Sequence, residues 1–313
     1  MQWKYSRSIR SRRLKRSLRI NYDLYLLCIP VVAYFIIFAY WPMYGVQIAF
    51  KNYSPAFGIA GSKWVGLEHL KVFLESFYFQ RLIRNTFAIS FYSIIVGIPA
   101  PIILALLFQE IRRKRLRAVV QAVSYAPNFM SIVVVCGMIM LFLSPRSGLI
   151  PAILNLFGVV IDTNPLAEPG LFWHIYVWSG VWQGIGWSSL VYTASIASIP
   201  VEQYEAATID GAGKMRQIFA VTLPNIMPTI IIITIFSLGG LLGVGHEKAY
   251  LLQNAINAET SEVISTYVYK AGLTGMPRYS FAAMVGLFNN LINITILALV
   301  NVIFKKTSDT SLW

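Results

Sequence analysis

Few residues of this chain have types and spacings that could perform chemistry, and the first candidate is a glycine–lysine segment. Asp210–Met215 contains a glycine followed by a lysine, as a phosphate-binding loop does. Such a loop also needs a glycine five residues before Gly213, where Thr208 stands, and a hydroxyl residue after the lysine, where Met215 stands. We therefore expect that this chain does not itself bind ATP.

A second candidate is the His246-Glu247 pair, which could begin a zinc hydrolase motif. That motif needs a second histidine four residues after the first, and Tyr250 stands there. Nor does the chain show a cluster of acids, a His–Asp pair or metal-ligand spacing that would support a membrane enzyme acting on lipid-linked substrates. We expect no metal site and no catalytic residues.

Polar and aromatic residues within apolar segments are better candidates, and their chemistry is sugar binding. Segment 174–198 holds Trp178, Trp182, Gln183, Trp187, Ser188, Tyr192 and Thr193. Sugars offer apolar ring faces and many hydroxyls, which aromatic rings, amides and hydroxyls can bind. The alternative is an aromatic stripe that packs helices or marks a membrane interface.

A second polar set, Asn289 and Asn293, lies on the last apolar segment together with Asn290. These amides could contribute to a substrate path, or they could form hydrogen bonds between helices. From the sequence we place Trp178, Trp182, Gln183, Tyr192, Asn289 and Asn293 on the candidate path.

The elements that must position these residues are membrane-spanning helices. The chain has 313 residues, of which 57% are hydrophobic and 12% charged. A bilayer core of ~30 Å needs ~20 apolar residues in a helix, and six segments qualify. They are 24–44, 85–109, 118–143, 174–198, 224–245 and 283–304. The sequence therefore predicts an all-α polytopic membrane protein with six transmembrane helices, kinked or opened at Pro99, Pro101 and Pro127.

The distribution of charge sets the orientation and excludes other classes of protein. No span contains Asp, Glu, Lys or Arg, whereas carriers coupled to an ion gradient usually need such groups inside the membrane. Seventeen of the 26 bases lie on the face shared by the N-terminus, residues 110–117, the loop 199–223 and the C-terminus. This excess predicts that both termini are cytoplasmic and that the bases orient the protein rather than bind nucleic acid. We expect three regions, a basic cytoplasmic segment 1–23, a spanning domain 24–304 and a tail 305–313.

The loop 199–223 carries most of the functional information. Pro200 and the early acids suit a helix start, and Gly211 and Gly213 suit its end. On these grounds alone, an interfacial helix without a partner is as good an interpretation as a docking surface. The pattern decides: Glu205-Ala206-Ala207, three residues, Gly211, nine residues, Val221, one residue, Leu223-Pro224. It resembles the EAA motif of binding-protein-dependent ABC importer permeases, with valine at Val221 where isoleucine is usual.

Other segments resemble the carbohydrate branch of this family, the polysaccharide-type permeases related to the larger maltose permease subunit. These segments are Trp41–Tyr53, Gly61–Leu67, Tyr125–Phe129, Gly186–Ser189 and Ser311–Trp313. His246 departs from the family, because an aromatic residue is usual before the acid. The resemblance covers nearly the whole chain.

The resemblance implies a type I importer bundle and a function in ATP-driven uptake of an oligo- or polysaccharide across the bacterial plasma membrane. It implies a second, homologous permease (a heterodimer), two cytoplasmic ABC ATPase subunits and an extracytoplasmic solute-binding protein as partners, besides membrane lipid. ATP and Mg²⁺ would bind to the ATPases, and this chain would bind no cofactor. The loop would be the coupling helix that docks on an ATPase. Its carried-over residues are Glu205, Ala206, Ala207, Asp210, Gly211, Leu223 and Pro224.

Overall fold

The computed structural model describes residues 20–160 and 162–307. It divides the chain into two compact units, Met1–Gly66 and Leu67–Trp313. Most of the predicted N-terminal segment 1–23, the end of the tail 305–313 and the motif Ser311–Trp313 lie outside the described residues. The three-region division therefore stays a prediction.

Unit 1 is built on a long apolar helix that changes type along its length. It runs through α2 (Tyr22–Phe35), the π-helix η1 (Ile36–Tyr40), α3 (Trp41–Met43) and the 3₁₀-helix η2 (Tyr44–Phe50). Pro42 has no N–H to donate, which accounts for the change in hydrogen bonding around it. Two short antiparallel strands follow, β1 (Lys51–Asn52) and β2 (Lys63–Trp64), on either side of α4 (Gly58–Gly61). The all-α prediction missed this strand pair.

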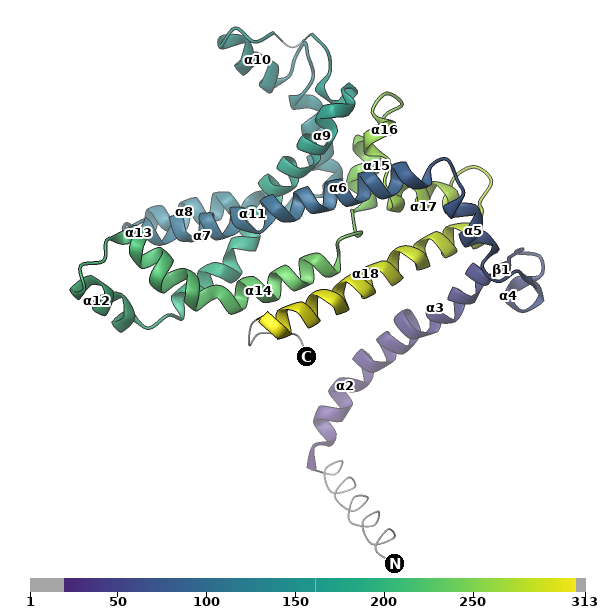
Figure 1. The fold of residues 1–313 in the computed structure, drawn as a ribbon, viewed down its shortest axis with the longest axis horizontal. Helices are drawn as coiled ribbons and strands as arrows, with labels where there is room; N and C mark the ends of the chain where they lie inside the picture. The colour runs from purple at the N-terminus through teal and green to yellow at the C-terminus, as the bar shows by residue number, and fades with distance from the viewer. Residues whose placement is uncertain (1–19, 161, 308–313) are drawn as a thin grey trace, which may run out of the picture. The chain divides into compact units, whose positions relative to one another are not determined.

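Unit 2 is a helical bundle (Figure 1). Its helices are α5 (Glu68–Leu74), α6 (Phe79–Gly97), α7 (Pro99–Glu110), α8 (Lys114–Tyr125), η3 (Ala126–Phe129), α9 (Ile132–Phe142), α10 (Leu149–Leu156), η4 (Pro165–Ala167), η5 (Pro169–Leu171), α11 (Phe172–Ala197), α12 (Val201–Ile209), α13 (Lys214–Gln217), η6 (Ile218–Thr222), α14 (Leu223–Gly239), α15 (His246–Leu252), α16 (Ala258–Ser261), α17 (Ile264–Leu273) and α18 (Tyr279–Thr307). Helices α12 and α13 lie at one end of this unit and α15 to α17 at the other (Figure 1). We call these the α12 end and the α15 end.

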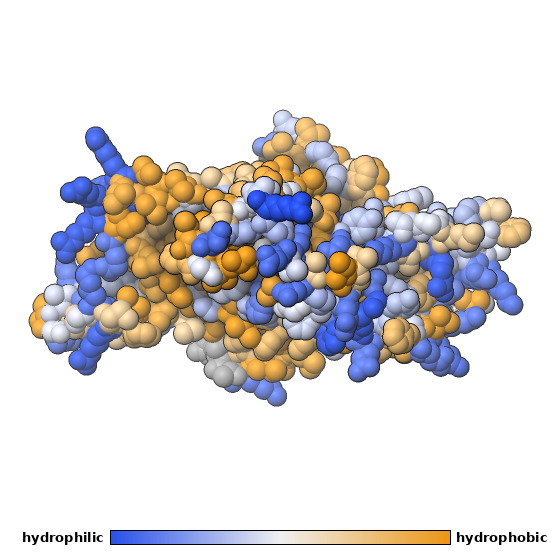
Figure 2. Space-filling view, turned by 90° about the horizontal axis from the view of Figure 1, so that it is seen from above, coloured by the Kyte–Doolittle hydropathy of each residue, from blue (hydrophilic) through white to orange (hydrophobic). Residues whose placement is uncertain are grey.

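Within residues 20–160 and 162–307, four continuous helical stretches are long and apolar enough to cross a membrane, or five if a bent pair counts as one span. The four are Tyr22–Phe50, Phe79–Glu110, Lys214–Gly239 and Tyr279–Lys306. Helix α11 is the remaining predicted span, and its 26 residues would rise ~39 Å. Its tryptophans, serines and glycines make it less apolar than the others. Large hydrophobic residues are accordingly exposed on the surface of the molecule (Figure 2).

The predicted third span, 118–143, is not one helix. It consists of α8 with η3 and then α9, which are bent by 101°. Pro127 interrupts the hydrogen bonding at the bend, and Ser131 starts α9 afresh by accepting a hydrogen bond from the Val134 amide at 3.3 Å. Gly186 allows α11 to cross here, because a Cβ at this position would lie 2.0 Å from the Ser124 carbonyl oxygen.

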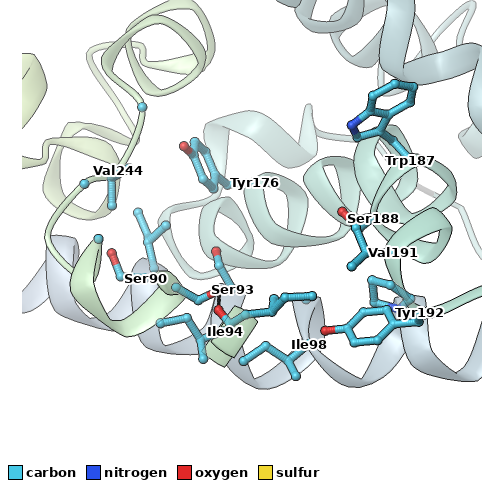
Figure 3. A pocket seen from close by; sticks show the side chains of 18 residues that line it. Ser90, Ser93, Ile94, Ile98, Tyr176, Trp187, Ser188, Val191, Tyr192 and Val244 are labelled. Carbon is cyan, nitrogen blue, oxygen red and sulfur yellow. Dashed lines mark hydrogen bonds between the residues drawn. The ribbon is translucent and has the colours of Figure 1, made fainter. Parts of the chain in front are cut away.

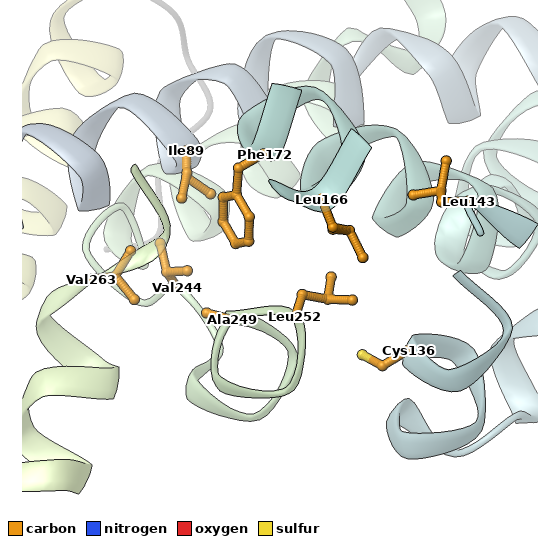
Figure 4. Packing of buried hydrophobic residues seen from close by; sticks show 9 residues of the cluster. All are labelled: Ile89, Cys136, Leu143, Leu166, Phe172, Val244, Ala249, Leu252 and Val263. Carbon is orange, nitrogen blue, oxygen red and sulfur yellow. The ribbon is translucent and has the colours of Figure 1, made fainter. Parts of the chain in front are cut away.

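Three buried clusters of the described residues hold the bundle together. The first joins α6, α9, α11 and α15 around Ile89, Cys136, Phe172 and Ala249 (Figure 4). The second lies toward the α12 end and includes Tyr192 and Ile226, and the third packs α5 and α6 on α17 and α18. Removal of apolar side chains from water stabilises the parts of these clusters that lie outside the membrane. Within the membrane, close packing of the side chains holds the helices together.

Candidate functional site

Helix α12 is the centre of the loop 199–223, and its ends follow from its sequence. Pro200 precedes its first turn, and Gly211 follows its last with φ +74°. The Gly211 amide donates to the Thr208 carbonyl at 3.0 Å and the Ala212 amide donates to the Ala207 carbonyl at 2.8 Å. This pair of bonds is the Schellman motif, which needs a left-handed residue at the position of Gly211. The glycine of the motif thus has a defined conformational role.

Side-chain hydrogen bonds tie α12 to the helix that follows it. The Tyr204 hydroxyl pairs with the Thr222 hydroxyl at 3.0 Å, and the Asn225 amide donates to Gln203 at 2.7 Å. The Gln217 amide donates to the Thr208 hydroxyl and to the Ala212 carbonyl, both at 3.0 Å. Tyr204 also packs against the second cluster. Helix α12 and the start of α14 are therefore joined at several points.

The opposite face of α12 is exposed. Its exposed residues include Glu202, Glu205, Ala206, Ile209 and Asp210, whereas Ala207 is half-buried. Ile209 is 86% exposed, which is unusual for an isoleucine on a helix that is braced from behind. The face thus combines acids, a small residue and an apolar tip, a composition that suits a protein groove.

Leu223 and Pro224 begin α14 directly after the π-helix η6. Val221 and Leu223 pack against the second buried cluster, and Pro224 is exposed. Nearby, Lys214 forms an ion pair with Glu110 at the end of α7. The predicted motif residues therefore lie together at the α12 end, some on the exposed face and some at the root of the loop.

A cavity of about 550 Å³ lies between α6, α11 and α14. Apolar residues form much of its wall, and hydroxyls and aromatic rings interrupt it (Figure 3). The polar and aromatic lining residues are Ser90, Ser93, Tyr176, Trp187, Ser188, Tyr192 and Ser237. Tyr192 is 1% exposed, and its buried hydroxyl has no hydrogen-bond partner among the described residues. A buried hydroxyl without a partner is costly, so this one is suited to a ligand or to water.

Only Tyr192 of the six predicted path residues lines this cavity. Trp178 and Trp182 line a separate, nearly apolar crevice of about 380 Å³, formed with α9 and α10. The Trp178 indole donates to the Tyr92 hydroxyl at 2.9 Å, and the Gln183 amide donates to the Met130 carbonyl at 3.3 Å. The structure thus brings the two tryptophans together and places Gln183 against the bend that precedes α9.

The two predicted asparagines lie together near the end of α14. The Leu242 amide donates to Asn293 at 2.8 Å, and the Asn289 amide donates to the Leu242 carbonyl at 3.2 Å. These bonds hold α18 to the segment after α14, as interhelical amides often do. Neither asparagine lines the cavity of about 550 Å³.

The sequence prediction missed the cavity residues outside α11, namely Ser90 and Ser93 on α6 and Ser237 on α14. A signal was present, because Ser90, Ser93 and Gly97 recur at helical spacing and make one small, polar stripe in an apolar span. Such a stripe also occurs where helices pack closely, so it identifies a face of the helix but not its occupant.

The long apolar helices, the braced surface helix and the cavity with polar and aromatic residues in its apolar walls define a multi-pass membrane permease. The chain belongs to the family described as binding-protein-dependent transport system inner membrane component, whose model matches residues 97–309. The predicted membership of this family is thereby confirmed, together with the type I permease fold, while the coupling role of the motif residues stays a prediction. Members of this family are permease subunits and not enzymes, and the ion-coupled carrier finds no support.

Individual relatives cover nearly the whole chain. It is 38% identical over 291 residues to Protein LplB of Bacillus subtilis, which covers 93% of this chain and 91% of the relative. It is 36% identical over 310 residues to the polygalacturonan/rhamnogalacturonan transport system permease protein YteP of Bacillus subtilis, covering 99% and 95%.

Two solved structures of ABC transporters contain chains that are similar to this one over nearly its whole length. A chain of a bacterial ABC transporter involved in import of the acidic polysaccharide alginate matches with a TM-score of 0.86 and 38% identity, covering 94% of this chain and 99% of that one. A chain of a bacterial alginate ABC transporter in complex with its alginate pentasaccharide-bound periplasmic protein matches with a TM-score of 0.87 and 37% identity, covering 96% and 100%.

Proposed function

We propose that this chain is one of two homologous permease subunits of an ATP-driven importer for oligo- or polysaccharides. Relatives named for polygalacturonan/rhamnogalacturonan and alginate transport support a carbohydrate substrate. The observation that carries the proposal is the cavity, in which serine hydroxyls, an indole and the Tyr192 hydroxyl interrupt apolar walls. No residue in the described part of the chain forms a hydrogen bond with that hydroxyl. Such a lining matches the alternating apolar faces and hydroxyls of a sugar chain.

In this proposal the cavity is half of the sugar path. Tyr192 is the predicted path residue that faces it, and Ser90, Ser93 and Trp187 join it there. Trp178, Trp182 and Gln183 would contribute only if the crevice beside α9 also belongs to the path. Asn289 and Asn293 would act indirectly, by holding α18 against the end of α14.

The exposed face of α12 is the docking surface for one of two cytoplasmic ATPase subunits. Glu205, Ala206 and Asp210 would contact the ATPase, while Ala207 and Gly211 would set the shape of the helix and its end. Leu223 and Pro224 would pass its movement to α14. ATP and Mg²⁺ would bind to the ATPases, and this chain would hold no cofactor.

The orientation in the membrane follows from the assignment of α12 as the docking surface for a cytoplasmic ATPase. The α12 end and both termini would be cytoplasmic in a bacterial plasma membrane, and the α15 end would face an extracytoplasmic solute-binding protein. The excess of bases on the α12 side supports this orientation.

Reconstituted vesicles test the proposed function. The chain, assembled with its partner permease and ATPases, should take up binding-protein-delivered oligosaccharide only when ATP is enclosed on the ATPase side. An imposed proton or sodium gradient without ATP should drive no uptake. Gradient-driven uptake without ATP would instead support the ion-coupled carrier.

A further inference from the structure

Lys248 is a buried cation with no acidic partner in the described part of the chain. It lies on α15, and the residue is 7% exposed. The other buried or half-buried bases of this region are paired, since Arg81 and Lys270 both reach Glu262. None of the ion pairs among the described residues includes Lys248.

The surroundings of Lys248 position its ammonium on α11. The ammonium donates to the Tyr176 carbonyl at 2.7 Å and lies 4.6 Å from the centroid of the Tyr176 ring. Gly180, one turn further along α11, leaves room for it, because a Cβ there would lie 3.1 Å from the Lys248 nitrogen. The charge is thus fixed against one turn of α11.

This turn of α11 is also a wall of the cavity. Tyr176 and Val244 line the cavity at one end, whereas Trp187 and Tyr192 lie at the other (Figure 3). Gly245, which follows Val244 in the chain, also lines the cavity. Lys248 follows Gly245 by three residues and lies against the Tyr176 ring. Its charge therefore lies close to the α15 end of the cavity, behind an aromatic side chain.

A neutral hydrogen-bond donor at position 248 could also bond the Tyr176 carbonyl and so join α15 to α11, with a smaller free-energy cost of desolvation than a charged lysine. Burial lowers the pKa of Lys248 to about 8, so most of the lysine is still protonated at pH 7. A buried charge without a counter-ion is unfavourable unless something compensates it. A negatively charged ligand in the adjoining cavity would provide that compensation, and the low local dielectric would let the charge act across the ring.

We propose that Lys248, held by Tyr176 and Gly180, selects saccharides that carry carboxylates over neutral ones at the α15 end of the cavity. This inference rests on the proposed function, because it takes the cavity as the sugar path. Lys248 is a specificity-determining residue that acts through its charge on the cavity beside it. Serine and tyrosine hydroxyls elsewhere in the cavity would bind the sugar hydroxyls shared by acidic and neutral substrates.

The test compares matched substrates in the assembled transporter, reconstituted with its binding protein and with ATP. Oligogalacturonate and oligomannuronate are each supplied as the free acid and as the methyl ester, which removes the charge. The concentration dependence of uptake is measured and normalised to assembled complex. Wild-type protein should reach half-saturation at a concentration about tenfold lower for an acid than for its ester.

Lys248→Gln should remove this preference while uptake of the esters continues, and Lys248→Arg should retain most of it. Gly180→Ala should weaken it by displacing the ammonium without changing the charge of the chain. Lys71→Gln is the control, because it removes a base whose side chain is 75% exposed and which pairs with Glu75. This variant should leave the preference unchanged.

Three outcomes would overturn the inference. Wild-type protein could treat acid and ester alike, Lys248→Gln could keep the preference, or Lys248→Gln could reduce uptake of both forms equally, as a purely structural tie would. Failure of the proposed function looks different, because the wild-type complex would then show no ATP-dependent uptake of any of the four saccharides.

Discussion

The coupling loop and the cavity differ in how far apart in the sequence their residues lie. The hydrogen bonds that brace α12 join residues between 5 and 22 positions apart. The cavity draws its lining from α6, α11 and α14, between residues 89 and 245. A local structure leaves its pattern in one stretch of sequence, whereas a cavity between distant helices leaves only small, separated signals.

The two ends of unit 2 also differ in their charges. The α12 end pairs its lysine with an acid at the surface, Lys214 with Glu110. At the α15 end, Lys248 is buried and forms no ion pair with an acid in the described part of the chain. An exposed ion pair contributes little to stability, while a buried cation affects whatever lies beside it. This contrast teaches that the number of charges is less informative about function than their burial and pairing.

Labelling from opposite sides of the membrane gives the largest expected difference between the two ends. Met276, between α17 and α18, is 94% exposed, and Met215, on α13, is 65% exposed. In intact cells an impermeant thiol reagent should label Met276→Cys and fail to label Met215→Cys. Permeabilised cells should label both, which controls for reactivity. Labelling of Met215→Cys in intact cells would contradict the proposed orientation.

Substitution at Gly211 tests whether the coupling loop depends on its local backbone conformation. Gly211→Val places a β-branched residue at φ +74°, where side chains are strained by roughly 1–2 kcal/mol. We expect the variant to reach the membrane but to lose its ATPase subunits on detergent extraction, with uptake reduced at least about tenfold.

Gly213→Ala is the matched control, because Gly213 has φ −67° and open space around its Cβ position. It should retain both the ATPases and uptake. If Gly211→Val co-purified with the ATPases and transported normally, the loop would not depend on its Schellman turn.

Raising the pH tests the role of the Lys248 charge at the α15 end of unit 2. With a pKa lowered to about 8 by burial, Lys248 is mostly charged at pH 7 and mostly neutral at pH 9. The preference for acidic over esterified saccharide should therefore fall several-fold between these values. Cys136 on α9 and Tyr176 on α11 are the titratable groups that face it, and Lys248→Arg should remove most of the pH dependence.

Measuring the thermal stability of the complex at each pH distinguishes a loss of substrate preference, caused by deprotonation of Lys248, from a loss caused by unfolding. Because the folded pKa of Lys248 lies below its ordinary 10.5, the native chain binds fewer protons than the unfolded chain between about pH 8 and 10.5. The contribution of this lysine to stability therefore rises with pH in that window. A fall in preference that tracked a loss of assembled complex would point to another cause.

The sequence predicted the α12 end better than the cavity, for physical reasons. The end of α12 at Gly211 depends on local backbone geometry, which a motif records. The break in the third span needed Pro127 and also the close crossing of α8 on α11 at Gly186, which joins residues about 60 positions apart. The partner of Gln183, Met130, lies at that break, and the partner of Trp178, Tyr92, lies on α6, so both contacts join distant parts of the sequence. Aromatic and amide residue types alone could not show which side of α11 faces the cavity.

The smallest expected effects distinguish two residues of α11, one that lines the cavity and one that lines the crevice. Tyr192→Phe removes only the hydroxyl, which has no hydrogen-bond partner among residues 20–160 and 162–307, so packing against the second cluster should persist. If that hydroxyl binds sugar, its loss costs about 1 kcal/mol, and the half-saturating concentration should rise about five-fold with normal assembly.

Trp182→Ala empties part of the apolar crevice beside α9. A packing residue there would lower the yield of assembled complex and leave the concentration dependence unchanged.

Uptake by both variants is measured against saccharide concentration and normalised to assembled complex. This measurement decides whether the cavity or the crevice is the sugar path. A raised half-saturation in Tyr192→Phe with an unchanged one in Trp182→Ala would assign the sugar path to the cavity side of α11. The reverse pattern would move the path to the crevice, because an aromatic platform that stacks on sugar contributes to affinity in a way that a packing residue does not. In that event Trp178, which lines the same crevice and is 55% exposed, becomes the next residue to replace.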